Sequence, residues 1–442
     1  TLSLHDALPI YYREQDFLYL NNKNGTFSEV LNKQIGHIPL FSMGSDMADI
    51  NNDGNADIFV TEMLPEDDAS IKTKTTFENW DKYQLDLRYD YYHQFTRNML
   101  QLNNGNRINK DAGTPFFSEI GQLSGIQATD WSWSVLLADF NNDGWKDMHI
   151  TNGIGRDFIN ADFLEFSNNI FNNAQSREEQ QKAIRKKLSS LKTVDLPNYL
   201  YLNNKDLTFS DQSETGGINE PSMSNGAAYA DLDNDGDLDL IVNNINKPAF
   251  VFINNTNQKN KFSTIHYLSV QLKGDSLNGK AFGSKVLVYN NGKAQLLEQN
   301  PVRGYFSSVD QQLVFGLGEN DHADSLAIIW PDGKKQVLQN VKADTSFTVL
   351  WKNAGINTVK SASESTFLFS DITGESGLLY KHQDNPYNDY TVQRLLPQKY
   401  SQLGPFITTG DINNDGATDF FIGGAFNFSG KFFIQHTGQI FT

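Results

Sequence analysis

Four short loops of the chain concentrate aspartate at a regular spacing. Each has the pattern D-x-[ND]-x-D-G-x-x-D and runs into an apolar segment, and the four copies begin at Asp49, Asp139, Asp231 and Asp411. The third copy, DLDNDGDLD, holds five aspartates in nine positions. Neighbouring carboxylates repel one another unless a cation neutralises them, and oxygen-only ligands select a hard ion such as Ca²⁺. The pattern therefore predicts a calcium loop.

The positions of the oxygen-bearing residues fit a loop that wraps around one ion. Side chains at positions 1, 3, 5 and 9 can converge, position 7 can offer its backbone carbonyl, and glycine at position 6 permits the sharp turn. We therefore predict about four structural Ca²⁺ ions, one in each loop. The predicted ligands are Asp49, Asn51, Asp53, Asn55, Asp57, Asp139, Asn141, Asp143, Trp145, Asp147, Asp231, Asp233, Asp235, Asp237, Asp239, Asp411, Asn413, Asp415, Ala417 and Asp419.

These loops differ from an EF-hand, which requires a bidentate glutamate at position 12 and a helix on either side. Position 12 is apolar in every copy: Val60, Ile150, Val242 and Ile422. The exit from each loop therefore predicts a strand, and we expect each loop to lie inside a β-hairpin. The alternative is a metal-free turn, because Asn and Asp favour turns without any ion. Turn propensity does not explain acidic residues at positions 1, 5 and 9 of all four copies.

The segments around the loops predict an all-β chain built from repeats. FLYLNNKNGTFSEV from Phe17 and YLYLNNKDLTFSDQS from Tyr199 alternate with period 2 and contain Asn and Gly turns, a pattern typical of paired strands. Each repeat then supplies about four short strands, the size of one β-propeller blade. Insertions interrupt the repeats at 61–96 and 157–197. The second contains SREEQQKAIRKKLSSL, the one short helical insertion that the periodicity predicts.

The segment between the third and fourth loops lacks the motif. Its short strands, as in SKVLVYNNGK and SLAIIWPDGKKQ, predict an antiparallel sandwich or barrel. The chain starts without Met and stops within a strand pattern, so we expect a fragment whose export signal is not included. The predicted order is a non-native leader (1–10), three blades (11–262), the sandwich or barrel-like domain (263–352), a linker (353–366) and the start of further blades (367–442).

Composition narrows the classes of partner. The formal net charge of -17 disfavours nucleic acid, whose phosphates require a basic surface. No run of 18 or more apolar residues occurs, so we expect no transmembrane segment in these 442 residues. The absence of cysteine excludes disulfides and thiol nucleophiles, although it does not fix the compartment.

The loops and their flanking strands resemble the FG-GAP or VCBS repeats of calcium-binding β-propellers, as in integrin α-chains and many secreted bacterial proteins. Residues 265–351 resemble the ASPIC/UnbV domain through GSKVLVYNNGK, QLVFGLGE and LAIIWPDGKKQVL. The organisation is similar to that of large exported proteins of Bacteroidetes-like bacteria. The resemblance implies propeller blades with bound calcium and an ASPIC/UnbV domain, at an extracellular, cell-surface or periplasmic location.

The sequence offers little for catalysis. It contains no H-E-x-x-H, G-x-S-x-G, P-loop or G-x-G-x-x-G motif. We therefore predict a non-catalytic calcium-binding scaffold for protein or glycan binding and adhesion at the cell surface. The alternative is a cell-surface enzyme that acts on polysaccharide in the propeller funnel. Trp131 and Trp133 are predicted to share one face of a strand and to pack in the core, with a sugar-stacking platform as the alternative. The oligomeric state is not predicted.

Overall fold

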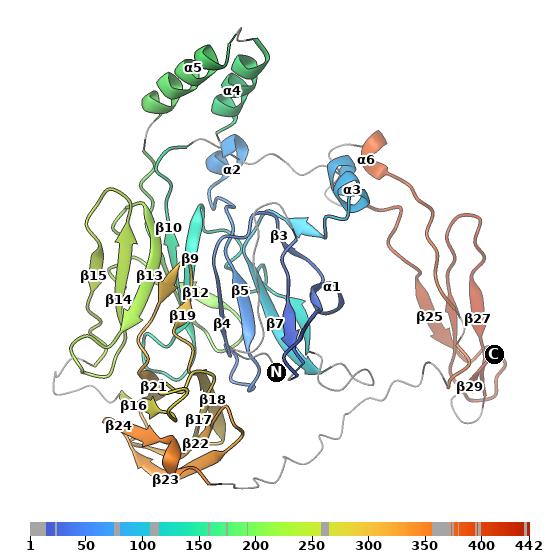
Figure 1. Cartoon of the computed structure of the whole chain (residues 1–442). Helices are drawn as coiled ribbons and strands as arrows, with labels where there is room; N and C mark the ends of the chain where they lie inside the picture. Colours follow the sequence, from blue (N-terminus) through green and yellow to red (C-terminus); the bar gives the residue numbers. More distant parts are fainter. Residues whose placement is uncertain are drawn as a thin grey trace. The chain divides into compact units, whose positions relative to one another are not determined.

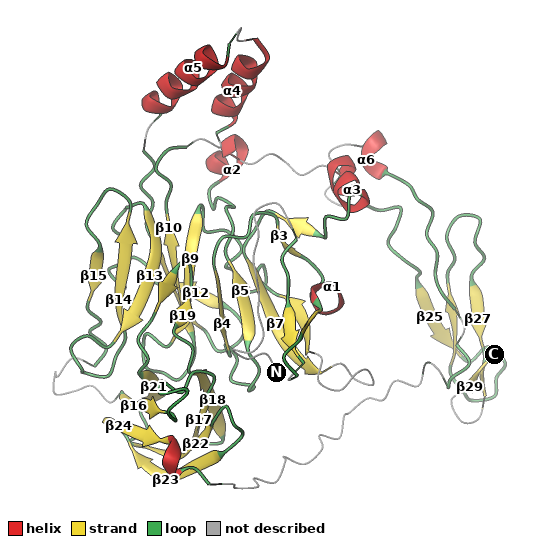
Figure 2. Cartoon of the chain, in the orientation of Figure 1, coloured by secondary structure: helices red, strands yellow, loops and turns green. Residues whose placement is uncertain are grey.

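The computed structural model consists mainly of short antiparallel sheets (Figures 1 and 2). It describes residues 15–355 except 23, 75–79, 107–114, 158–159, 174–175, 192 and 258–264, and residues 373–442 except 374, 379, 394–395, 397–398 and 437–439. The predicted leader and most of the predicted linker lie outside the described residues. The chain divides into two compact units, Thr1–Arg107 with Asp111–Lys360 and Ile108–Lys110 with Ser361–Thr442.

Three sheets of the first unit contain their strands in chain order, each antiparallel to the next, and we call them blades 1, 2 and 3. Each aspartate loop of this unit joins the first two strands of a blade, which confirms the predicted hairpins. The described residues do not form a closed ring of blades. The strands are β4 (Ser45–Ala48), β5 (Asp57–Val60), β7 (Met99–Asn106) and β8 (Pro115–Glu119) in blade 1, β9 (Ser132–Ala138), β10 (Asp147–Asn152), β11 (Tyr199–Asn203) and β12 (Phe209–Asp211) in blade 2, and β13 (Ser224–Ala230), β14 (Asp239–Asn244) and β15 (Phe250–Phe252) in blade 3.

Neighbouring blades are held together by apolar side chains on the faces of their sheets. Phe59 and Leu100 of blade 1 share a buried cluster with Leu137 and Met148 of blade 2. This pattern follows from strand periodicity, because alternate residues of each strand point to opposite faces and can fill the space between two sheets. Two short strand pairs lie outside the sheet of blade 1. One is β1 (Tyr19–Asn21) with β2 (Phe27–Glu29), which are antiparallel, and the other is β3 (Ile38–Pro39) with β6 (Gln94–Phe95), which are parallel.

The insertions are more helical than predicted. The predicted helix is present as α5 (Arg177–Ser190), and Ser176 caps it by accepting a hydrogen bond from the Glu179 N–H. The expectation of one short helical insertion is nevertheless wrong, because the described residues contain three more helices in the insertions. These are α2 (Asp68–Lys74), α3 (Trp80–Arg88) and α4 (Ala161–Asn173). Their many Asn, Asp and aromatic residues have modest helix propensity and concealed the 3.6-residue period.

After blade 3 the chain forms two facing sheets, which we call the module. One sheet has the order β21-β16-β24 and the other β18-β17-β22-β23. Between them lies a buried cluster that includes Leu268, Val288, Phe315 and Trp330. A sandwich is therefore present, but the expectation that it is antiparallel throughout is wrong, because β16 and β24 pair in parallel. Its strands are β16 (His266–Lys273), β17 (Lys285–Asn290), β18 (Lys293–Glu298), β21 (Leu313–Gly318), β22 (His322–Ile329), β23 (Lys335–Lys342) and β24 (Thr345–Leu350), with the hairpin β19 (Val302–Arg303) and β20 (Ser307–Ser308) and the 3-10 turn η1 (Trp351–Asn353).

The second unit repeats the blade pattern on a smaller scale. Its main sheet has the order β25-β26-β27, and the fourth aspartate loop joins the first two of these strands. Apart from the short helix α1 (Leu31–Gln34) in the first unit, the remaining elements belong here. They are β25 (Ile407–Gly410), β26 (Asp419–Ile422), β27 (Lys431–Phe433), β28 (Gln435–His436), β29 (Ile440–Phe441) and α6 (Asp389–Val392).

Candidate metal sites in the aspartate loops

All four loops close in the same register. The residue before position 1 is small, and it pairs directly with the aspartate at position 9, which opens the next strand. The four pairs are Ala48 with Asp57, Ala138 with Asp147, Ala230 with Asp239 and Gly410 with Asp419. This pairing places the carboxylates of positions 1 and 9 at the base of every loop.

Those two carboxylates also organise the loop backbone. In the third loop, the two oxygens of Asp231 accept hydrogen bonds from the N–H groups of Asp235 and Gly236, both at 3.1 Å. Asp239 Oδ2 accepts from the Leu232 N–H at 2.7 Å. The same three bonds recur in the other loops. The spacing of the aspartates therefore specifies the turn before any ion binds.

Position 4 has a conformational requirement that the sequence analysis missed. Its asparagine adopts a left-handed conformation, with φ between 56° and 60°, and glycine at position 6 has φ between 85° and 91°. Asparagine is one of the few residues with a side chain that tolerates this region. The invariant asparagine at position 4 in all four copies was the available signal. The position-4 residues are Asn52, Asn142, Asn234 and Asn414.

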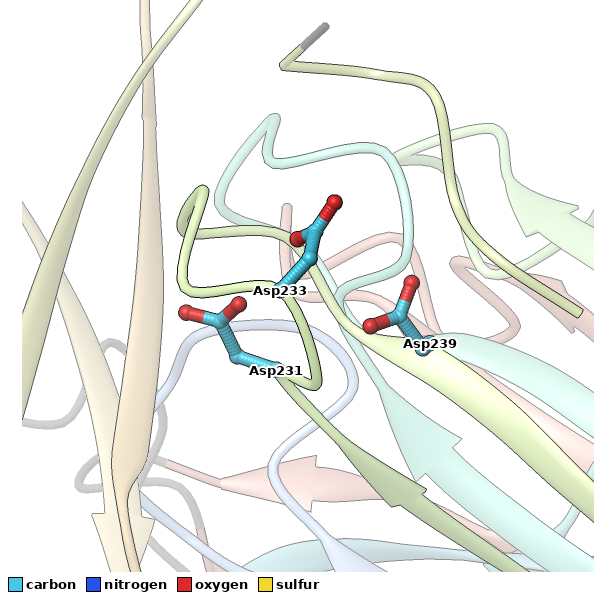
Figure 3. A group of neighbouring side chains, drawn as sticks. All are labelled: Asp231, Asp233 and Asp239. Atoms are coloured by element: carbon cyan, nitrogen blue, oxygen red, sulfur yellow. The ribbon is translucent and has the colours of Figure 1, made fainter.

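The third loop brings three carboxylates together, as Figure 3 shows. One oxygen from each of Asp231, Asp233 and Asp239 lies within 4.8 Å of the others. Asp239 is buried, Asp231 is half-buried and Asp233 is exposed, so the cluster is accessible from solvent on one side. These distances suit a hard cation such as Ca²⁺, for which three carboxylates would supply part of an all-oxygen ligand set. Three of the five predicted ligands of this loop therefore converge.

The side chains of the other two predicted ligands of the third loop, Asp235 and Asp237, lie outside this group of three carboxylates. Asp235 is not part of the three-carboxylate group, and its Oδ1 accepts a hydrogen bond from the Asp237 N–H at 3.2 Å. The Asp237 side chain, predicted to have no role beyond its backbone carbonyl, is fully buried, and its Oδ2 accepts from the Asn257 N–H at 2.8 Å. Asp237 therefore also anchors the chain that leaves blade 3.

The remaining loops have asparagine at position 3 and offer fewer carboxylates. In each of them the amide nitrogen at position 3 donates to the carboxylate at position 5, at 2.8 to 3.2 Å. Among the described residues, only the third loop therefore forms a group of three acidic side chains able to hold an ion. The donor residues are Asn51, Asn141 and Asn413, and a cation in these loops stays a prediction.

The environment of the loops differs strongly between the two units. Burial raises the pKa of Asp49 to about 6 and that of Asp57 to about 7 in the first loop. Burial also raises the pKa of Asp139 to about 6 in the second. In the exposed fourth loop, the hydrogen bond from the Ala417 N–H instead lowers the pKa of Asp415. Enclosed loops thus hold carboxylates whose charge is costly without a proton or a cation.

Two lysines provide part of the missing positive charge at the second loop. Lys205 Nζ lies 3.0 Å from Asp143 Oδ2. Lys146, at position 8 of the loop, is completely buried, and its ammonium group opposes the effect of burial on the Asp139 pKa. The sequence motif does not reveal the role of Lys146, because position 8 can hold any residue in the pattern. The second and third loops therefore carry different charge at similar backbone geometry.

Two further asparagines, also missed from the sequence, connect the second and third loops to the rest of their blades. Asn203 lies on β11, and its N–H donates to Asp147 Oδ1 at 3.0 Å. Its side-chain amide donates to the carbonyls of Lys146 and, in blade 1, Ile50. Asn254 makes the equivalent contacts between blade 3 and blade 2. These residues hold neighbouring loops at a fixed separation.

Comparison with known families assigns both parts of the first unit. The FG-GAP-like repeat family matches residues 6–60 and 193–242, which contain the first and third aspartate loops. The ASPIC and UnbV family matches residues 274–356, in the module. The chain contains FG-GAP-like repeats and an ASPIC/UnbV domain. The resemblance on which the sequence analysis relied is confirmed, and the module is the ASPIC/UnbV domain.

The repeats and the ASPIC/UnbV domain together have distant curated relatives. Cartilage acidic protein 1 of Xenopus tropicalis is 24% identical over 326 residues, which cover 72% of this chain and 38% of the relative. Cartilage acidic protein 1 of Mus musculus is 26% identical over 341 residues, which cover 76% of this chain and 41% of the relative. The chain thus spans about two fifths of the length of these relatives.

The structure also tests the predicted packing of the aromatic pair Trp131 and Trp133. Trp131 is buried in a cluster with Met63 and Ile154, and the half-buried Trp133 donates its indole N–H to the Gly153 carbonyl at 2.7 Å. The prediction that this pair packs in the interior is therefore supported.

None of the helices in the described part of the chain is both long enough and apolar enough to cross a bilayer.

Proposed function

We propose that this chain is part of an exported, calcium-stabilised scaffold that binds a protein or glycan partner at the cell surface. The observation that carries the proposal is the convergence of Asp231, Asp233 and Asp239 within one FG-GAP-like loop. The group contains only carboxylate oxygens, and one of the three side chains is open to solvent, so a hydrated hard cation can enter. Calcium would supply the positive charge that five aspartates in nine positions require.

We infer an extracellular setting by analogy with the calcium loops of extracellular modules. Exposed oxygen-ligand loops of extracellular modules bind calcium at roughly 10⁻⁴ to 10⁻³ M. A site of that strength is filled only where free calcium is plentiful. We therefore assign the loop to a compartment outside the cytoplasm.

The packing at the first strands of the three blades favours a scaffold over an enzyme with its active site in a propeller funnel. The β19–β20 hairpin of the ASPIC/UnbV domain lies against β4 of blade 1 and β13 of blade 3. Arg303 Nη1 is 2.9 Å from Asp46 Oδ1, and both side chains are buried. The Tyr305 N–H donates to Ser134 Oγ of blade 2 at 3.1 Å. The charges of Arg303 and Asp46 are therefore used in packing the domain against the blades.

The insertions offer the contact surface. Helices α4 and α5 pack against each other, and α4 leaves Leu164 and Phe171 exposed. Apolar side chains on a helical insertion of a rigid β scaffold are suited to contact a partner. We place the partner surface on these insertions.

The first test is a thermal melt of the full chain in 2 mM calcium, in excess chelator, and in 2 mM magnesium. At the expected affinity, each bound ion adds about 0.7 to 1.8 kcal/mol to the free energy of unfolding, so the midpoint should rise by a few degrees in calcium alone. Equal midpoints in calcium and chelator would refute the calcium site. An equal rise in magnesium would refute its selectivity for calcium.

A further inference from the structure

The ASPIC/UnbV domain is seated directly on the second and third aspartate loops. The clearest contact is at Gly316 of β21, where a β-carbon would lie 2.3 Å from Asp139 Oδ2 and 2.4 Å from the Asn142 Cα. Gln295 of β18 donates to the Gly316 carbonyl at 2.7 Å, and its amide also lies against Gly144. Only a glycine at position 316 allows this approach, although its own φ is ordinary.

A chain of hydrogen bonds runs from the third loop to the domain. The Asn142 side-chain amide donates to the carbonyl of Gly236, the turn glycine of the third loop, at 3.0 Å. The Asn142 carbonyl in turn accepts from the Gly318 N–H of β21 at 2.9 Å. Asn142 is completely buried and has a left-handed conformation, so both bonds are made inside the packed region. One residue of the second loop thus links the turn of the third loop to the ASPIC/UnbV domain.

The domain also touches the third loop directly. A β-carbon at Gly236 would lie 2.1 Å from the ring of Tyr267, which belongs to β16. Val309 and Val314 of the domain share a buried cluster with Leu238, the residue at position 8 of the third loop. The domain therefore covers the third loop at Gly236 and Leu238, both of which are buried, whereas Asp233 of the same loop is exposed.

We propose that the ASPIC/UnbV domain positions the third aspartate loop, so that docking of this domain and cation binding at Asp231, Asp233 and Asp239 strengthen each other. This proposal depends on the calcium site of the proposed function. A docked domain desolvates a loop that contains five aspartates, and a bound cation offsets their repulsion. Docking in turn fixes the loop backbone, so less conformational entropy is lost when the cation binds. Such coupling is necessarily reciprocal.

The test uses the full chain and measures calcium affinity by isothermal titration. Gly316→Ala inserts a methyl group where no space exists, and we expect the dissociation constant of the third-loop site to rise about tenfold. Gly355→Ala is the matched control, because Gly355 lies in the same domain with ordinary φ and no atom within 4 Å of the added β-carbon. Gln295→Met, which removes the bond to the Gly316 carbonyl, should act in the same direction if the alanine variant fails to fold.

The reciprocal effect is measured by hydrogen exchange at the Gly318 amide. Calcium should slow this exchange in the wild type, and Asp233→Asn should abolish the slowing, because Asp233 contacts the ion site and not the domain. The coupling is wrong if the wild type binds calcium and Gly316→Ala or Gln295→Met binds it equally well. It is also wrong if calcium leaves the Gly318 exchange rate unchanged. A wild type that binds no calcium would overturn both this proposal and the proposed function.

Discussion

The aspartate at position 9 has two roles that can be separated experimentally. In the third loop, Asp239 Oδ2 accepts the Leu232 N–H of its own turn, and Oδ1 accepts the Asn254 N–H at 2.7 Å. Asp239 is 1% exposed, whereas Asp233 is exposed. Asp239 therefore stabilises the blade with or without an ion, whereas Asp233 is positioned for the ion alone.

Substitutions at these two aspartates should have different effects in chelator and in calcium. Asp239→Asn places an amide nitrogen against a backbone N–H, so the free energy of unfolding in chelator should fall by about 1 to 3 kcal/mol. Asp233→Asn should leave stability in chelator unchanged or raise it slightly, because it removes one of five mutually repelling carboxylates, and it should remove most of the calcium-induced increase. Urea unfolding of both variants in each condition measures this. Similar losses for both in chelator would contradict the separation of roles.

At the scale of elements, the blades are connected through polar groups as well as apolar faces. Asn52 at position 4 of the first loop donates to the Gly144 carbonyl of the second at 2.9 Å, and Asn142 does the same for Gly236 of the third. Asn203 links blade 2 to the Ile50 carbonyl of blade 1 at 2.9 Å. The first loop therefore depends on the second for its position, and the second on the third.

Asn203→Ala tests this connection between blades. It leaves two buried carbonyls, of Ile50 and Lys146, without their donor, and we expect the free energy of unfolding to fall by about 1 to 3 kcal/mol. The adjacent Asn204→Ala is the control, because Asn204 is exposed and its side chain bonds only to Thr208 and Ser210 of its own hairpin, with no bond to another blade among the described residues. Chemical denaturation of the two variants measures the difference. Equal, small effects would show that the link between the blades contributes little.

At the scale of the molecule, the chain has a net charge of -17, and much of its acidity lies in the four aspartate loops, of which the first two are largely enclosed by the fold. Burial raises the pKa values of Asp57, Asp49 and Asp139 far above those of exposed carboxyls. Folding thus opposes the ionisation of these groups. The same enclosure that orders the loops makes them dependent on protons or cations.

This enclosure predicts an unusual pH dependence for the calcium-free protein. Because the folded pKa of Asp57 is about 7 and lies above its unfolded value, the folded state binds more protons between about pH 4 and pH 7. The free energy of unfolding should therefore fall as pH rises through this range. Urea unfolding at several pH values measures the slope. Asp57→Asn should reduce it, and an identical slope in that variant would contradict the assignment to Asp57.

The sequence by itself determined the features that depend on local chemistry. The aspartate spacing, the glycine at position 6 and the apolar exit predicted four hairpin loops, and all four are present. Strand alternation predicted the blades and the sandwich. These features follow from turn geometry and from the two-residue period of strands, which neighbouring residues alone can specify.

Only the tertiary structure decided which of the predicted residues act together. It brings Asp233 to Asp231 and Asp239 but not Asp235, whose carboxylate accepts a hydrogen bond from the Asp237 N–H. It pairs Arg303 with Asp46 across 257 residues of chain and places Gly316 against the second loop. Such contacts depend on how separate sheets pack. Packing of that kind is set by the shapes of whole faces, and no short stretch of sequence contains it.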